Sequence, residues 1–457
     1  MVNNFKIGYL PLTKANWTNK ALESARRDTK AYLEQIPGVE VIGGDQMLDL
    51  EEKAVKELEY FEKERPNLII AHFMTFSLGV VVPMFVQRLG VPVVLWSMKE
   101  PDPHGGRLKN NSFCAANMNS HFMYRMHIPY FHIHAEANSD KAKKELLRAI
   151  RIVKTCNMLQ RMRIGLIGGR VPGFYTSCCN ECLLRTKLGP EVKMITEHEV
   201  IETAKSLTDN EVEAALKEIL NDAPVHKTDG PPMDQLKKSA ALFAAVLKMK
   251  EQFLVDILAI RCWPEFIVSK LYGIAICSTI GHLNNREIVT ACEGDVYGAV
   301  MMSIEKSLTN GLPFFCDLIV AEGSYGVTWH CGAAPARLCK PGFQPNLRLS
   351  SSIEGGGVKG VTNEFPLKPG RVTLARLGEK RDGDGFRMLI ATGTGIDTDL
   401  FVRGNPLKIK FDAGCDKLRD VVIRQGWEHH YAMCYGDLVP DLVKLCDVLN
   451  IEPVVVQ

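Results

Sequence analysis

The chain has 457 residues, of which 46% are hydrophobic and 24% are charged, and its formal net charge is +2. A chain of this length is expected to form two or three domains rather than one core. The near-neutral charge, without a long basic tract, argues against a nucleic acid or a membrane surface as the partner. No apolar run approaches the roughly 18 residues that a membrane-spanning helix requires.

The compartment is predicted from the first residues and from the cysteines. The opening sequence MVNNFKIGYL lacks the apolar core of a signal peptide, so we expect a cytoplasmic protein. The 14 cysteines suit that compartment as free thiols. Cys178, Cys179 and Cys182 contain a C-x-x-C motif, but no second pair of ligands follows at the spacing of a zinc site. We expect ordinary thiols there.

The first 160 residues alternate between short apolar runs and amphipathic stretches. Strands are predicted at 5–10, 39–44, 67–72 and 92–97, and helices at 19–33, 50–65 and 78–89. The alternation predicts an α/β domain over residues 1–160, with a doubly wound parallel sheet that is covered on both faces. The polar loop after the fourth strand, residues 97–112, is long enough to be functional or interfacial.

A second α/β domain is predicted for residues 161–311, again with a Rossmann-like or flavodoxin-like parallel sheet. Its first strand leads into the glycine-rich sequence GGRVPGFYTS. Because the glycines lack the G-x-G-x-x-G spacing and Pro172 stands where a helix would begin, we expect no dinucleotide cofactor. Residues 312–457 are rich in glycine and in short apolar runs, which predicts a β-rich, antiparallel, barrel-like C-terminal domain.

Two carboxylates mark the segment from Glu287 to Glu322, which has the pattern strand, acidic turn, helix, loop and strand. Glu293 follows the first strand and Asp317 lies inside the second. Ligands of open α/β sheets bind at the carboxyl ends of the strands, so both are candidate site residues. The structural alternative is that Glu293 caps the helix and Asp317 pairs with a buried arginine. The residues alone leave both interpretations open.

A pair of histidines, His429 and His430, belongs to a strand-like run near the C-terminus. Adjacent side chains on a strand point to opposite faces, so at most one of them is expected to face a given site. One imidazole with two carboxylates suits Mn²⁺ or Mg²⁺ better than Zn²⁺, which prefers more nitrogen or sulfur ligands. A surface turn is the structural alternative for this pair.

Four segments, ACEGDVYGA, LPFFCDL, TWHCGAAP and HHYAMCYGD, together resemble the L-fucose/L-arabinose isomerase superfamily, and its L-fucose isomerase branch in particular. The resemblance implies an aldose–ketose isomerase of carbohydrate metabolism, an intramolecular oxidoreductase that works through an ene-diolate. Mn²⁺ would chelate O1 and O2 of the open-chain sugar, with Mg²⁺ or Co²⁺ as alternatives. The metal-binding residues of such enzymes map onto Glu293, Asp317 and His430. Glu293 and Asp317 are also the expected proton carriers, and which of them is the base stays open.

Further side chains are candidates for contacts with the sugar, and core packing is the structural alternative for several of them. The candidates are His330, His429, Trp17, Trp96 and Trp263, together with Lys14 and Arg107 for an anionic group. His121, His127, His132 and His134 form a cluster in the sequence, and the H-x-H pattern within it, His132 and His134, places two imidazoles on one strand face. That pattern predicts either a second metal site or an interface.

The resemblance leaves two alternatives open. The substrate is either a neutral sugar or an anionic one such as a 6-sulfo hexose. The chain could also be a non-catalytic sugar-binding or regulatory protein, but the intact set of Glu293, Asp317 and His430 favours an enzyme. The resemblance further implies a homo-oligomer, a hexamer or similar. We expect loop 97–112 of one subunit, with Arg107, to lie over the metal of its neighbour.

Overall fold

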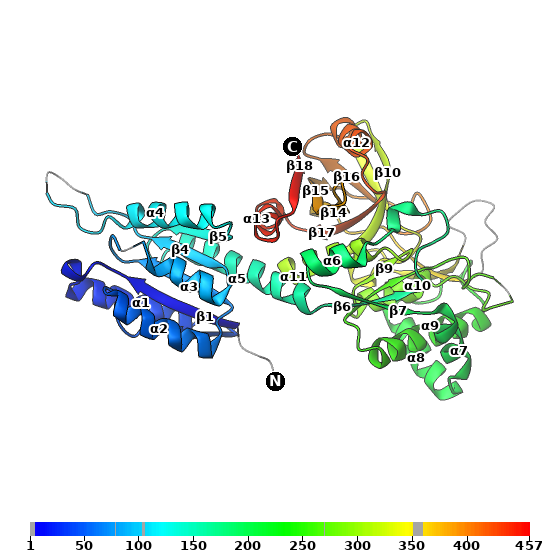
Figure 1. The fold of residues 1–457 in the computed structure, drawn as a ribbon. Helices are drawn as coiled ribbons and strands as arrows, with labels where there is room; N and C mark the ends of the chain where they lie inside the picture. Colours follow the sequence, from blue (N-terminus) through cyan, green and yellow to red (C-terminus); the bar gives the residue numbers. More distant parts are fainter. Residues whose placement is uncertain (1–4, 78, 103–105, 269, 351–359) are drawn as a thin grey trace. The chain divides into compact units, whose positions relative to one another are not determined.

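The computed structural model describes residues 5–77, 79–102, 106–268, 270–350 and 360–457. By their internal contacts they divide into two compact units, Met1–Lys154 and Thr155–Gln457, and the boundary falls inside helix α5 (Asp140–Arg161) (Figure 1). In the part of the chain that is described, no helix is both long and apolar enough to cross a membrane.

The first unit is built on a five-stranded parallel sheet with the strand order β2-β1-β3-β4-β5. Its strands are β1 (Phe5–Leu12), β2 (Val39–Gly43), β3 (Leu68–Phe73), β4 (Val93–Ser97) and β5 (Tyr130–His134). Every residue of β3 and β4 is buried, which explains their almost continuous apolar sequences. This strand order is that of a doubly wound, flavodoxin-like fold.

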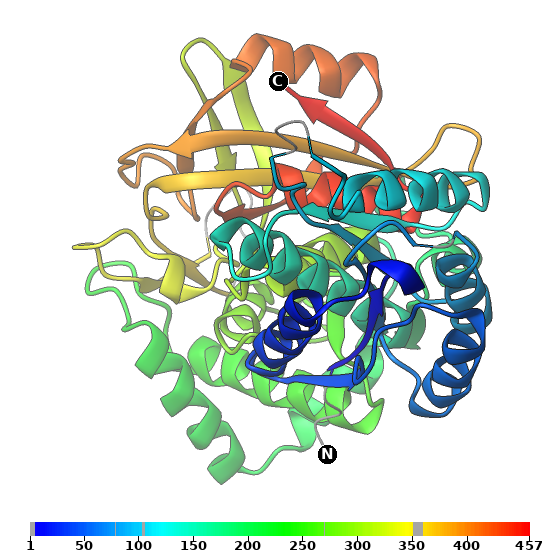
Figure 2. The same cartoon turned by 90° about the vertical axis from the view of Figure 1, so that its left-hand side faces the viewer.

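Helices cover both faces of this sheet. They are α1 (Lys20–Glu34), α2 (Glu51–Glu64), α3 (Val81–Leu89) and α4 (Ser112–Arg125), besides α5. Helices α2, α3 and α4 contact one another in turn along one face, and α1 lies on the other (Figure 2). The local sequence sets their ends: the Asn19 side chain caps α1 by accepting from the Leu22 N–H, and α3 ends at Gly90 in the left-handed conformation.

The second unit begins with a four-stranded parallel sheet in the order β7-β6-β8-β9. Its strands are β6 (Arg163–Ile167), β7 (Glu191–Ile195), β8 (Ile257–Ile260) and β9 (Thr290–Cys292). The helices that accompany it are α6 (Glu181–Lys187), α7 (Glu197–Ser206), α8 (Asp209–Asp222), α9 (Met233–Gln252), α10 (Cys277–Asn285) and α11 (Val296–Thr309). Thr196 and Thr208 each start a helix with a complete capping box.

A closed antiparallel barrel follows in the same unit. Six strands form the ring in the order β14-β17-β10-β11-β16-β15, and pairing of β14 with β15 closes it. They are β10 (Phe314–Glu322), β11 (Tyr325–Trp329), β14 (Gly370–Glu379), β15 (Phe386–Gly395), β16 (Leu407–Phe411) and β17 (His430–Tyr435). Helix α11 packs against β14 and β17, so it joins the end of β9 to the barrel.

Shorter elements complete the second unit. They are strands β12 (Asn346–Leu349), β13 (Val361–Glu364) and β18 (Glu452–Val456), helices α12 (Cys415–Arg424) and α13 (Val439–Leu449), and the 3-10 turns η2 (Tyr175–Ser177) and η3 (Ala336–Leu338). Strand β18 adds to β15 in parallel. The predicted fold class, two parallel-sheet α/β units and a β-rich, barrel-like C-terminal part, is confirmed. The division into three domains stays a prediction.

Candidate active site

Four of the predicted side chains, Glu293, Asp317, His429 and His430, meet in the second unit. Glu293 lies in the turn after β9, Asp317 in β10, and His430 begins β17. The Nε2 atom of His430 lies 2.5 Å from Glu293 Oε2 and 3.9 Å from Asp317 Oδ1. The register of the barrel explains the second contact, because Asp317 stands directly opposite His430 on the neighbouring antiparallel strand.

A strained turn presents Glu293 to the site. Its φ of 58° is in the left-handed region, and Gly294 follows with a φ of 67°. A Cβ atom on Gly294 would lie 2.1 Å from the carbonyl oxygen of Gly169, so only glycine allows the turn to pack against the loop after β6. Left-handed non-glycine residues such as Glu293 are uncommon and concentrate at functional sites.

Asp295 caps the helix and pairs with a buried arginine, the two structural roles that the sequence analysis considered for Glu293 and Asp317. Its Oδ1 caps α11 by accepting a hydrogen bond of 2.8 Å from the Gly298 N–H. Its Oδ2 pairs with the buried guanidinium of Arg376 at 2.5 Å and contacts Nδ1 of His430 at 2.9 Å. The structural alternative for Glu293 and Asp317 is therefore wrong, because Asp295 caps the helix and pairs with the arginine instead.

Charge is balanced around His430. Burial alone would lower the pKa of His430, but its contacts with Asp295 and Glu293 raise it to about 9. Burial would likewise raise the pKa of Glu293, and the hydrogen bond and charge of His430 lower it. Arg376 and His430 together hold the pKa of Asp295 well below its usual range, against the effect of its burial. The carboxylates of Asp295 and Glu293 on either side of His430 thus favour its protonated form.

The expectation that only one of the two histidines faces the site is wrong. His429 lies one residue before β17, so the alternation of side chains along a strand does not apply to it. The two imidazole rings are 3.8 Å apart between centroids, and His429 Nδ1 contacts Thr176 Oγ1 at 2.9 Å. Burial and the neighbouring His430 lower the pKa of His429. A neutral imidazole can serve as a metal ligand.

The donor atoms fit a divalent cation. Candidate ligand atoms of Glu293, His429 and His430 lie within 4.8 Å of one another, and in the described ranges no other group of three histidine, cysteine or acidic side chains does so. Asp317 Oδ1 is buried and has no hydrogen-bond partner among the described residues. A buried carboxylate oxygen without a partner is costly, and a cation beside it would satisfy it.

Two further predicted residues lie around this group. His330 is buried, and the ring of Phe315 contacts both His330 and His430, with centroid distances of 5.4 and 4.7 Å. Burial alone would lower the pKa of His330, but its neighbour Cys331 and the charges of Asp317 and Glu293 raise it to about 9. Trp263 packs edge-on against Phe174 at 5.7 Å, and Phe174 contacts His429 at 5.4 Å.

The other predicted sugar contacts belong to the first unit. Trp96 is fully buried, its Nε1 donates to the Ala135 carbonyl at 2.9 Å, and its ring stacks on His72, which fits the core-packing alternative. Lys14 and Arg107 are exposed, and Trp17 is half-buried. Residues 103–105 of the loop 97–112 lie outside the described residues. A role of these side chains in sugar binding stays a prediction.

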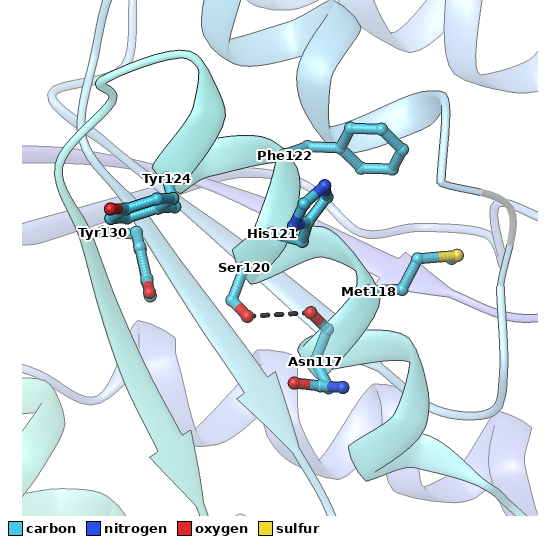
Figure 3. A pocket seen from close by; sticks show the side chains of 7 residues that line it. All are labelled: Asn117, Met118, Ser120, His121, Phe122, Tyr124 and Tyr130. Atoms are coloured by element: carbon cyan, nitrogen blue, oxygen red, sulfur yellow. Dashed lines mark hydrogen bonds between the residues drawn. The ribbon is translucent and has the colours of Figure 1, made fainter.

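Two members of the predicted histidine cluster, His132 and His134, come together in the first unit. His132 Nε2 and His134 Nδ1 both contact Ser97 Oγ, at 3.2 and 2.9 Å, so the H-x-H pattern does place both rings on one face of β5. His121 instead lines a hollow of about 580 Å³ beside α4, where the rings of Tyr124 and Tyr130 lie together (Figure 3). Among the described residues, no third histidine, cysteine or acidic side chain joins these two in a group that could hold a metal ion.

Sequence reasoning missed three residues that the geometry makes prominent. Asp295 was recognisable as an N-cap, because an aspartate stands directly before a helical apolar repeat. Arg376 was recognisable as a charge inside the strand run RVTLARLGE. Arg170 follows Gly169 beside the Glu293 turn; its guanidinium lies over the Tyr175 ring at 5.0 Å and has no carboxylate partner in the described part of the chain.

Comparisons with known proteins give full-length relatives, although no family model matches the chain. Sulfoquinovose isomerase from Alkalicoccus urumqiensis is 28% identical over 98% of this chain and 99% of its own length. The sulfoquinovose isomerases from Priestia aryabhattai and from Clostridium sp. (strain MSTE9) are each 27% identical over 99% of both chains.

One similar solved structure is an ABC transporter periplasmic solute-binding protein from Actinobacillus succinogenes with bound D-allose. It is 12% identical over 67% of this chain and 92% of its own, with a TM-score of 0.18. Similarity at that level supports no conclusion about this chain.

Proposed function

We propose that this chain, which its full-length relatives identify as an aldose–ketose isomerase, carries out the reaction at a divalent cation held by Glu293, Asp317 and His430. The observation that carries the proposal is the meeting of these three side chains, from three separate elements, around the Nε2 atom of His430. As an aldose–ketose isomerase, the chain is an intramolecular oxidoreductase.

Mn²⁺ is the proposed cation. Two carboxylates and one or two imidazoles form a set of oxygen and nitrogen donors. Mn²⁺ binds such donors in preference to thiolates. His429 stands beside the proposed ligands and is the alternative to Asp317 in the set. When bound, the ion would polarise the sugar carbonyl and stabilise the negative charge that develops on the sugar oxygens.

The carboxylates are the proposed proton carriers. One of them takes the proton from C2 of the open-chain aldose, and a proton is returned at C1 to give the ketose. C2 is oxidised and C1 is reduced within the same molecule, so the reaction needs no external electron acceptor. Glu293 Oε2 and Asp317 Oδ1 flank the same nitrogen of His430, at 2.5 and 3.9 Å, so both are near any sugar bound there.

The proposed substrate is a hexose with an anionic group on C6. The relatives are named for sulfoquinovose, a sulfonated hexose, and Arg170 offers this chain a cation close to the site. A Cβ at Gly294 would lie 3.5 Å from Arg170 Cα, so the residue borders the Glu293 turn. A guanidinium that lacks a carboxylate partner is suited to bind a sulfonate through two hydrogen bonds.

A substrate screen tests this function. Neutral aldoses and 6-sulfonated or 6-phosphorylated ones are incubated with the protein and Mn²⁺, and ketose formation is measured. We expect turnover of a 6-sulfonated aldohexose, and Arg170→Met should raise KM for that substrate while leaving KM for a neutral hexose unchanged. Arg185→Met, an exchange at an exposed arginine of α6, is the control. Absence of ketose from every aldose would contradict the proposal.

A homo-oligomer with a shared site is the proposed assembly. Phe113, Phe122 and Tyr124 expose 55%, 39% and 75% of their surface on α4, and exposed apolar surface of this kind supports an interface with another subunit. Mixing Glu293→Gln with Arg107→Ala protein should restore partial activity after subunit exchange if Arg107 acts on a neighbour's site. No recovery after demonstrated exchange of two inactive variants would contradict the shared site.

A further inference from the structure

We infer that Arg376 is a positioning residue that fixes both histidines of the candidate site through two separate branches of hydrogen bonds. The inference rests on the proposed function in one respect, namely that the histidines face a bound cation. It concerns a residue that contacts neither histidine directly and lies outside the proposed ligand set.

Arg376 contacts three different segments of the chain through its guanidinium. It lies in β14, its side chain is 0% exposed, and its three nitrogens face three different partners. Nη1 donates to Asp295 Oδ2 at 2.5 Å, Nη2 donates to the Thr176 carbonyl at 3.2 Å, and Nε lies 3.7 Å from Glu428 Oε2. The guanidinium thereby joins the barrel, the start of α11 and the turn η2.

The first branch leads to His430. Asp295 Oδ2 receives the Arg376 guanidinium and contacts His430 Nδ1 at 2.9 Å. This contact fixes the imidazole so that Nε2 points at Glu293 and Asp317. A carboxylate behind a ligating histidine sets the tautomer and the ring orientation, which raises the affinity for a metal ion.

The second branch leads to His429. Arg376 holds the Thr176 backbone through its carbonyl, and the hydroxyl of the same residue contacts His429 Nδ1 at 2.9 Å. His429 therefore also has its Nδ1 engaged, and Nε2 is the nitrogen left for a ligand. The two rings stand 3.8 Å apart, so a small displacement of either would change the space available to a cation.

A lysine cannot replace this geometry. The planar guanidinium donates in several fixed directions at once, whereas an ammonium is a single point charge on a flexible stem. Arg376→Lys can keep the charge beside Asp295 but cannot also hold Thr176 at its present position. A buried ion pair is itself weak evidence of a contribution to stability, which leaves orientation as the role that the contacts support.

Metal affinity provides the test, because it does not depend on turnover. Binding of Mn²⁺ is measured from the electron paramagnetic resonance signal of the free ion, for the full-length wild type and for Arg376→Lys. Loss of an outer partner of a metal ligand typically weakens affinity by about 10–100-fold, and we expect a loss in that range. Arg403→Lys is the matched control, since Arg403 pairs with the fully buried Glu364 and contacts neither histidine. Its Mn²⁺ affinity should equal that of the wild type.

A second variant isolates the branch to His429. Thr176→Val removes the hydroxyl, keeps the shape of the side chain and leaves Arg376 in place. We expect a weaker affinity for Mn²⁺, and we expect the losses from Thr176→Val and Arg376→Lys to be less than additive when combined, since both act on His429. If Arg376→Lys does not fold, Thr176→Val still tests the branch to His429, and wild-type affinity for Mn²⁺ in that variant overturns the inference that both histidines are fixed in this way.

The outcomes separate this inference from the function on which it rests. A wild type that does not bind Mn²⁺ overturns the proposed metal site and the inference with it. A wild type that binds Mn²⁺, together with an Arg376→Lys variant of equal affinity, overturns the inference alone. Equal losses in Arg376→Lys and Arg403→Lys also overturn it, because they would reflect general loosening of the fold.

Discussion

Asp317 and His430 stand directly opposite each other on the antiparallel strands β10 and β17, with 3.9 Å between Oδ1 and Nε2. The two residues are 113 positions apart in the chain, yet the barrel register makes them cross-strand neighbours. Glu293 approaches the same nitrogen from a different sheet, because α11 ties the end of β9 to the barrel. The candidate site therefore depends on the junction of the parallel sheet and the barrel.

Removing either carboxylate should reduce turnover without unfolding the protein. We expect Glu293→Gln and Asp317→Asn each to lower kcat by about 10²–10⁴-fold, which is the usual contribution of general acid–base catalysis. Circular dichroism should be unchanged, because both side chains are partly exposed at the site. Glu322→Gln, at the exposed end of β10, is the control and should retain wild-type kcat. Normal turnover in Glu293→Gln would exclude Glu293 as an essential group.

The two histidines should differ in their importance. His430 is fully buried and is flanked by both carboxylates and Asp295, whereas His429 is more accessible to solvent than His430 and adjoins Thr176. His430→Ala should therefore weaken Mn²⁺ binding much more than His429→Ala, as measured by calorimetric titration. A larger loss in His429→Ala would show that His429, rather than His430, is the principal imidazole ligand.

Gly294→Ala should be more damaging than an alanine at another left-handed glycine. Gly294 and Gly383 have nearly the same φ, 67° and 69°, but a Cβ at Gly294 would lie 2.1 Å from Gly169 O, whereas Gly383 has nothing within 4 Å. Both exchanges should carry the left-handed penalty of roughly 1–2 kcal/mol in the free energy of unfolding. Only Gly294→Ala should also displace Glu293 and reduce kcat. Equal effects in the two variants would show that the close approach is unimportant.

The first unit should lose stability in weak acid because of His72. The side chain is fully buried in β3, and burial lowers its pKa to about 3. Below the ordinary pKa of about 6.5 the unfolded chain takes up a proton that the folded unit does not, so the free energy of unfolding falls as pH falls, by up to about 1.4 kcal/mol per pH unit. His72→Phe should show a shallower dependence between pH 5 and 6.5 in urea unfolding. Identical slopes would mean that His72 titrates normally.

Much of the fold followed from local patterns, because its strands and helices are strongly periodic. Helix α10 was not predicted, because every residue from Cys277 to Asn284 is buried and no polar face marks the helix. The strand pattern made Glu293 and Asp317 candidate site residues, and the resemblance assigned them to a metal site together with His430. Their meeting depends on the pairing of β10 with β17, which a single sequence does not encode in its spacing.

Other features of the site depended on exact backbone positions. The alternation of side chains along a strand does not apply to His429, because β17 begins one residue after it. Strand ends are the least certain part of such a prediction. Asp295 has an N-cap signal in the sequence, but Glu293, two residues earlier, is an acidic residue that could also cap the helix. Arg376 could be recognised as a charge in a buried strand, but its partners come from segments far away in the chain.

Chelation and reconstitution test the central claim most directly. The protein is stripped of divalent cations with a chelator, and ketose formation from a 6-sulfonated aldohexose is measured before and after addition of Mn²⁺ or Zn²⁺. The metal-free protein should be inactive, and Mn²⁺ should restore turnover better than Zn²⁺, because the proposed ligands are two carboxylates and an imidazole. Undiminished ketose formation by the metal-free protein would contradict a reaction carried out at a cation bound by Glu293, Asp317 and His430.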